Sequence, residues 1–201
     1  STVPRLSRAF PDAPPAAPVR IVHLGVGNFH RAHQAWYTAH APDADQWGIA
    51  GFTGRRPDTA DALTPQDGLY TLITRGAEGD TFELIGSLSA VHPAADHKAY
   101  LDYLGDPQIA LVTITVTEAG YIRSGEGRLD QDRDVIIADL EGLRSDIRGP
   151  VSSLPARLVA GLMARRNANS GPITILSCDN LPENGPVTKT VVSDFAALVD
   201  E

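Results

Sequence analysis

A glycine turn near the start of the chain is the first place where this sequence could bind a ligand. Residues 25–30 have the sequence GVGNFH. Gly25 permits a tight turn, and Gly27 lets the backbone approach a diphosphate without a Cβ in the way. A helix after the turn would add free amides and the positive end of its dipole. The turn alone is also consistent with a ligand-free strand–helix junction or with the adenosyl cofactor of a methyltransferase, and His30 stands where a third glycine is expected.

An asparagine late in the chain could take part in the reaction itself. Asn180 follows the apolar run at residues 173–178, and open α/β sheets bind ligands at the carboxyl ends of their strands. Hydride transfer to a ketone builds negative charge on its oxygen, and one fixed amide donor there can stabilise the transition state by about 3 kcal/mol. Asp179-Asn180 is also a common turn pair. The residues alone therefore leave a catalytic role and a turn-forming role open.

Polar residues also stand at the end of the most apolar run, residues 109–116. Thr115, Thr117 and Glu118 would lie at the carboxyl end of this strand, where a doubly wound sheet binds its ligand, and Glu118 could contact a cofactor or gate the site. His30 and His33 are three residues apart, but no third ligand has sensible spacing, so we expect no metal.

The elements that must position these residues alternate between strands and helices. Buried strands are predicted at residues 20–24, 47–53, 109–116 and 173–178. After Gly27 the apolar positions follow a helical period through residue 40. Residues 69–75 and 81–91 predict an antiparallel hairpin, and further helices are predicted at residues 55–63, 96–104 and 134–143, around residues 155–166 and from Pro186 onward. The order predicts an α/β, Rossmann-like doubly wound, mainly parallel sheet with an antiparallel hairpin insertion.

Composition narrows the class of protein. The net charge is −8 and the only cysteine is Cys178. An acidic chain without a basic run argues against nucleic-acid or anionic-membrane binding. We find no apolar run long enough to cross a membrane and expect a cytoplasmic protein. Residues 1–18, rich in Pro and Ala, predict an extended arm, and residues 19–201 predict one dinucleotide-binding domain.

Four ordered blocks carry a resemblance to a known family. They are residues 25–34 (GVGNFHRAHQ), 66–72 (QDGLYTL), 113–121 (TITVTEAGY) and 177–185 (SCDNLPENG). Together they resemble the mannitol dehydrogenase family of polyol-specific long-chain dehydrogenases, which includes fructuronate and tagaturonate reductases. The resemblance implies a nicotinamide cofactor, a catalytic asparagine at Asn180, and a separate helical C-terminal domain that carries a catalytic lysine. No lysine here lies in a matching motif, so we expect that domain to be missing from this chain.

The loop after the second strand bears on the choice of cofactor. Asp58 would accept hydrogen bonds from the adenosine ribose of NAD and repel a 2′-phosphate. Arg55 and Arg56 could instead bind the 2′-phosphate of NADP, and a solvated charged loop is the third possibility. We favour NAD. The residues expected to contact the cofactor are Gly25, Val26, Gly27, Asn28, Phe29, His30, Arg31, Arg55, Arg56, Asp58, Thr115, Thr117 and Glu118.

These observations predict the cofactor-binding part of an oxidoreductase that acts on a polyol or sugar acid, such as mannitol or fructuronate. We expect the chain alone to bind dinucleotide weakly, to turn over little or nothing, and to self-associate through the apolar surface that a second domain would cover. The alternatives are a dinucleotide-binding module or redox sensor without catalysis and, third, a methyltransferase.

Overall fold

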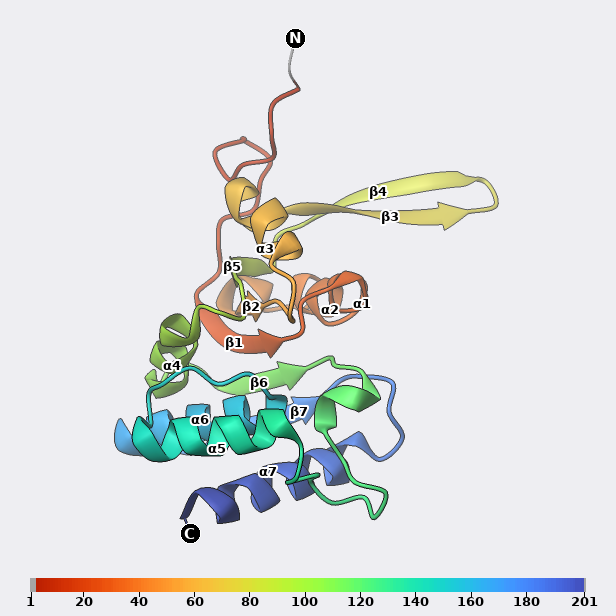
Figure 1. The fold of residues 1–201 in the computed structure, drawn as a ribbon. Helices are drawn as coiled ribbons and strands as arrows, with labels where there is room; N and C mark the ends of the chain where they lie inside the picture. The colour runs from red at the N-terminus through yellow and green to blue at the C-terminus, as the bar shows by residue number, and fades with distance from the viewer. Residues whose placement is uncertain (1–2, 201) are drawn as a thin grey trace. The chain divides into compact units, whose positions relative to one another are not determined.

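The computed structural model of the protein describes residues 3–200 and divides the chain into two compact units. Unit 1 ends at Ala94 and unit 2 begins at Ala95. Both units combine parallel strands with helices, as Figure 1 shows. The only antiparallel sheet in the described residues is the pair β3–β4. The predicted α/β class, a mainly parallel sheet with an antiparallel hairpin, is therefore confirmed.

The centre of unit 1 is a parallel sheet in the order β5-β2-β1. All five residues of β2 are buried, as expected for a strand covered on both faces. A Cβ on Gly51 would lie 2.3 Å from Cγ2 of Val26, so this strand needs glycine where the turn after β1 packs on it. The elements of unit 1 are β1 (Val19–Leu24), α1 (Asn28–Ala32), α2 (Gln34–Ala39), η1 (Ala44–Gln46), β2 (Gly48–Phe52), α3 (Asp58–Leu63), η2 (Thr64–Gln66), β3 (Tyr70–Gly76), β4 (Gly79–Ile85) and β5 (Leu88–His92).

Two predictions for unit 1 need correction. The single helix expected after Gly27 is broken into α1 and α2 at His33, whose φ of −121° and ψ of −91° are not helical. The imidazole Nδ1 of His33 lies 2.7 Å from the carbonyl oxygen of Phe29, so the side chain bonds to a backbone group at the break. The strand expected at residues 81–91 is two strands: β4 pairs with β3, and β5 pairs with β2 in parallel.

One side chain, that of Arg8, makes several of the hydrogen bonds that hold the Pro-rich N-terminal segment within unit 1. The Arg8 guanidinium donates to the carbonyl oxygens of Pro14, Asp67, Gly86 and Leu88, at 2.7, 3.2, 3.0 and 2.9 Å respectively. Gly86 leaves room for the segment, since a Cβ there would lie 2.4 Å from Pro14. Arg8 therefore joins residues of the N-terminal segment to the chain on both sides of the hairpin.

Unit 2 is built around the parallel pair β6–β7 and its helices. Leu111 of β6 pairs with Thr174 of β7, and the register continues to Ile114 and Ser177. Ser153 caps α6 and Asp96 caps α4 through side-chain oxygens, which satisfies the first amides of each helix. The elements of unit 2 are α4 (His97–Gly105), β6 (Leu111–Ile114), η3 (Glu118–Tyr121), α5 (Asp134–Ser145), α6 (Leu154–Asn167), β7 (Thr174–Ser177) and α7 (Asn184–Asp200).

The prediction that residues 173–178 form a buried strand is wrong in one respect. β7 is a strand, but none of its residues is buried and the side chain of Leu176 is 48% exposed. Within unit 2 it pairs only with β6, so one edge lacks a neighbouring strand. Among residues 3–200, no helix is long and apolar enough to cross a membrane.

Candidate functional site

The glycine turn joins β1 to α1 with a backbone that glycine favours. Gly25 has a φ of 101°, a left-handed conformation that costs other residues energy. Its amide and that of Val26 donate to the carbonyl oxygen of Phe52, at 2.9 and 3.0 Å. Gly27 then stands before α1 without a side-chain capping bond, and a Cβ there would meet nothing closer than 3.9 Å. The turn is thus fixed at Gly25 and Val26 and open at Gly27.

The side chain of His30 lies inside unit 1. Its ring stacks on that of His23, with 3.4 Å between the ring centroids and 13° between the planes, and both side chains are fully buried. Burial lowers the pKa of His30 to about 3, and burial followed by the neighbouring His30 lowers that of His23. Both imidazoles are therefore neutral at neutral pH. The residue in place of the third glycine offers a ligand only its backbone.

Arg31 holds the turn from its other side. Its Nε donates to the carbonyl oxygen of Gly27 at 3.2 Å, and its Nη2 donates to Oδ1 of Asn28 at 2.5 Å. The Tyr70 hydroxyl donates in turn to the carbonyl oxygen of Arg31 at 2.5 Å. Phe29 is 46% exposed and stacks on His33. The structure thus gives Arg31 a bracing role within the turn.

The loop after β2 presents its charged residues to solvent. Arg55, Arg56 and Asp58 are all exposed, with no hydrogen bond or ion pair to another residue of the described chain. Asp58 is the first residue of α3. Thr53, by contrast, is buried, and its amide donates to the carbonyl oxygen of His92 at 2.9 Å. The strand end is fixed while these three side chains are free to meet a ligand.

In unit 2, Asn180 is exposed on a turn held by its neighbour Asp179. The Tyr121 hydroxyl donates to the Asp179 carboxylate at 2.5 Å, and the amide of Val116 donates to the same oxygen at 3.4 Å. The Asn184 amide group donates to the carbonyl oxygen of Asp179 at 3.1 Å. Burial, and then the bond to Asp179, raises the pKa of Tyr121 to about 12. The Asn180 amide therefore projects from a braced turn.

The hydrogen bonds of Asp179 with Tyr121 and Asn184 were not predicted from the sequence. Asp179, Tyr121 and Asn184 all lie in the motif blocks at residues 113–121 and 177–185. The signal was a carboxylate directly before the candidate catalytic amide, at the end of a strand.

The residues beyond β6 differ in their surroundings. Thr115 is half-buried, while Thr117 and Glu118 are exposed. Glu118 pairs with Arg123, with 3.1 Å between Oε1 and Nη2, which supplies a partner that the sequence did not reveal. The Glu118 side chain is 72% exposed and that of Arg123 is 26% exposed, and a partly exposed ion pair contributes little to stability.

Cys178, next to Asp179, is not an activated nucleophile. Burial, and then the neighbouring carboxylate, raises the pKa of its thiol. A thiol with a raised pKa is mostly protonated at neutral pH and therefore a weak nucleophile.

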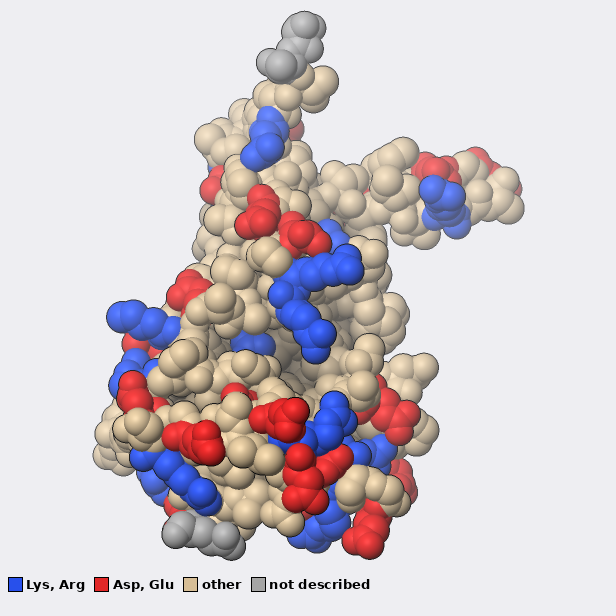
Figure 2. All heavy atoms as spheres, in the orientation of Figure 1, with Lys and Arg blue, Asp and Glu red and all other residues tan. Residues whose placement is uncertain are grey.

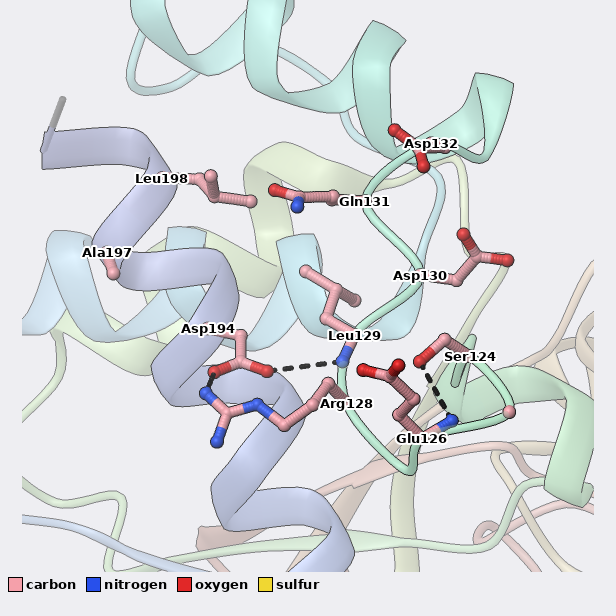
Figure 3. Close-up of a pocket in the computed structure, with 11 residues that line it drawn as sticks. Ser124, Glu126, Arg128, Leu129, Asp130, Gln131, Asp132, Asp194, Ala197 and Leu198 are labelled. Carbon is pink, nitrogen blue, oxygen red and sulfur yellow. Dashed lines mark hydrogen bonds and ion pairs between the residues drawn. The ribbon is translucent and has the colours of Figure 1, made fainter.

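A cavity of about 650 Å³ lies elsewhere in unit 2, between the loop after η3 and α7 (Figure 3). Asp194 accepts hydrogen bonds from the Arg128 guanidinium and from the amide of Leu129, which joins the loop to the helix. The cavity contains none of the predicted site residues. No group of His, Cys, Asp or Glu in residues 3–200 is arranged to hold a metal ion. The candidate site residues of each unit therefore lie outside this cavity.

Comparison with known proteins identifies the family. Residues 19–201 match the model of the mannitol dehydrogenase Rossmann domain. The chain belongs to the mannitol dehydrogenase family. The mannitol 2-dehydrogenase of Cereibacter sphaeroides is 40% identical over 187 residues, which make up 90% of this chain and 38% of that enzyme. The D-mannonate oxidoreductase of Escherichia coli is 40% identical over 190 residues, again 90% of this chain and 38% of that enzyme.

A solved structure of the family supports the same fold. The Pseudomonas fluorescens mannitol 2-dehydrogenase, in a ternary complex with NAD and D-mannitol, is 35% identical and has a TM-score of 0.82. The match covers 92% of this chain and 38% of that one. The predicted family is confirmed, and the chain spans less than two fifths of the family members it matches.

Proposed function

We propose that this chain is the NAD-binding part of an oxidoreductase that transfers hydride between a nicotinamide and a secondary alcohol or ketone of a polyol or sugar acid. The observation that carries the proposal is the turn at Gly25 and Gly27, braced by Arg31 and open at Gly27, in a chain of the mannitol dehydrogenase family. The family members named above act on mannitol and mannonate by their names. We propose a cytoplasmic location, because a chain with one cysteine forms no internal disulfide, which suits a reducing compartment.

Three parts of the chain would hold the dinucleotide. The diphosphate would rest on the backbone at Gly27, Asn28 and Phe29, where no side chain caps the amides. α1 has five residues, so these amides, more than a helix dipole, would supply the attraction. Asp58, exposed after β2, would accept hydrogen bonds from the adenosine ribose.

Residues that follow β6 and β7 are proposed for contacts with the nicotinamide and the substrate. Thr115, Thr117 and Glu118 would contact the cofactor where β6 ends. NAD accepts or donates the hydride when bound. The exposed Asn180 amide would donate to the substrate oxygen, and the Asp179–Tyr121 bond would hold that amide in place as negative charge develops there.

A base for the hydroxyl proton is the part that this chain does not supply. Its lysines are Lys98 and Lys189. Lys98 pairs with Asp102 at 2.6 Å on the exposed side of α4, and Lys189 is exposed on α7. We propose that the base comes from the part of the enzyme outside the matched 38%, and that residues 1–201 alone do not turn over polyols.

A ligand titration tests the proposal. We expect NADH fluorescence to change on addition of the purified chain, with weaker binding of NADPH and no binding of S-adenosylmethionine. Binding of S-adenosylmethionine without a response to NADH would instead indicate a methyltransferase. Rapid oxidation of mannitol by the 201-residue chain would contradict the proposal that the catalytic base lies outside this chain.

A further inference from the structure

The hairpin β3–β4 has two faces with different surroundings. Leu72 pairs with Glu83 across the hairpin, and the next pair, Ile73 with Phe82, points to the opposite face because side chains alternate along a strand. Glu83 accepts a hydrogen bond from Nε1 of Trp36 at 3.0 Å and lies 2.5 Å from Nε2 of His40. One face is therefore held by α2.

The other face carries uncovered apolar side chains. Ile73, Phe82 and Leu84 are 51%, 68% and 36% exposed. On the side that Figure 2 shows, the charged side chains of the hairpin gather toward its tip. A two-stranded sheet is marginally stable in water unless something packs on it. Packing on α2 leaves this apolar face, defined by Ile73, Phe82 and Leu84, exposed to solvent.

The hairpin begins beside the glycine turn. The Tyr70 hydroxyl, at the start of β3, is bonded to the carbonyl oxygen of Arg31, which braces the turn. In Figure 1 the two strands extend away from the rest of unit 1 on the side where α1 and α2 lie. Tyr70 lies on the same face of the hairpin as Glu83, so the apolar face is the one that makes none of these contacts.

We propose that the apolar face docks the part of the enzyme that lies outside the matched segment in the longer family members. Three side chains cover far less than the roughly 1,000 Å² that a stable interface between free partners needs. A partner in the same chain has an effective concentration near the millimolar range, so a small face is sufficient. Family members have the polypeptide for it, since the match covers only 38% of the Cereibacter sphaeroides enzyme. This inference rests on the proposed function.

The test compares two forms of the protein by hydrogen exchange. One is the 201-residue chain, and the other is the same chain joined at residue 201 to the remainder of the Cereibacter sphaeroides mannitol 2-dehydrogenase. We expect amides of residues 81–84 to exchange at least about tenfold more slowly in the joined protein. Phe82→Asp should restore fast exchange there. Ile137→Asp, which changes a 43% exposed isoleucine on α5, is the matched control and should not.

Three results would overturn the inference. They are equal exchange in both forms, strong protection in the monomeric 201-residue chain, and a dimer of that chain that Phe82→Asp dissociates, which would make a second copy the partner. If the joined protein does not fold, the aspartate is placed at the matching position of the intact Cereibacter sphaeroides enzyme and the same exchange is measured. NADH binding is titrated separately, so loss of the cofactor proposal and loss of the docking proposal are distinguishable.

Discussion

The imidazole of His30 lies flat against that of His23, 3.4 Å away, in the fully buried layer beneath the glycine turn. Two neutral rings pack there like any aromatic pair, but a proton on either would place a charge in the core. The stack therefore makes the stability of unit 1 depend on pH.

Replacing His30 by Phe should reduce this dependence. The pKa of His30 is about 3 in the folded chain and near 6.5 when unfolded, so between these values the unfolded state binds one proton more. Stability must then fall as the pH decreases from 6.5, by about 1.4 kcal/mol per pH unit for each such group. Urea unfolding at pH 7, 6 and 5 should show a shallower decline for His30→Phe. The control Tyr37→Phe, at an exposed position, should keep the wild-type slope, and parallel slopes for all three proteins would refute the prediction.

Gly27→Ala should separate ligand binding from folding. A methyl group at this position meets nothing closer than 3.9 Å in the free protein, so thermal unfolding should change little. It would stand where the diphosphate approaches the backbone, so NADH affinity should fall by at least about tenfold, or 1.4 kcal/mol. Gly125→Ala, which also has open space around it, is the control. Unchanged NADH binding by Gly27→Ala would contradict the proposal that the diphosphate binds at this turn.

Asp58→Ala should change the preference between cofactors. Loss of the carboxylate removes hydrogen bonds to the ribose and the repulsion of a 2′-phosphate, so NADH should bind about tenfold more weakly relative to NADPH. Fluorescence titration with both cofactors measures the ratio. Arg56→Ala, on the same loop, should leave NADH binding unchanged. The assignment fails if Arg56→Ala weakens NADH binding and Asp58→Ala does not.

Tyr121→Phe should destabilise unit 2 while preserving its packing. The ring is fully buried, and only the hydroxyl that donates to Asp179 is lost. A hydrogen bond to a charged group contributes about 1.5–3 kcal/mol, which urea unfolding can resolve. Tyr37→Phe, at an exposed position, is the control. A loss below about 0.5 kcal/mol would show that the Asp179 turn does not depend on this bond.

The sequence predicted the elements of the fold better than their surroundings. Residues 47–53 and 109–116 were predicted as buried strands because almost every side chain in them is apolar or small. The structure has strands at Gly48–Phe52, all buried, and at Leu111–Ile114, buried except for the half-buried Leu111. The same reasoning overestimated the burial of β7, since an apolar run does not reveal that a strand has a neighbour on one side only. Helical periodicity could not show the break at His33. The periodicity is a pattern of apolar side chains, whereas the break is a change in the backbone angles of one residue.

The candidate site was predictable from the sequence only where the residues that interact are neighbours within one short motif. The glycine turn is such a motif, and its strand–turn–helix setting is as predicted. The bond between Tyr121 and Asp179 joins residues 58 positions apart, and no local pattern specifies a pair at that separation. The stack of His23 on His30 was missed for another reason, since an inward imidazole and a ligand-facing one have the same place in a GxGxxG pattern.

The pairing of Leu111 with Thr174 has a consequence for how the protein is made. On the ribosome, β6 is synthesised long before β7, and α5 and α6 emerge between them. A parallel pair closed over so long a loop forms late and slowly. During that interval the apolar β6 lacks its neighbour β7, so chaperone binding to the nascent chain should concentrate on this strand.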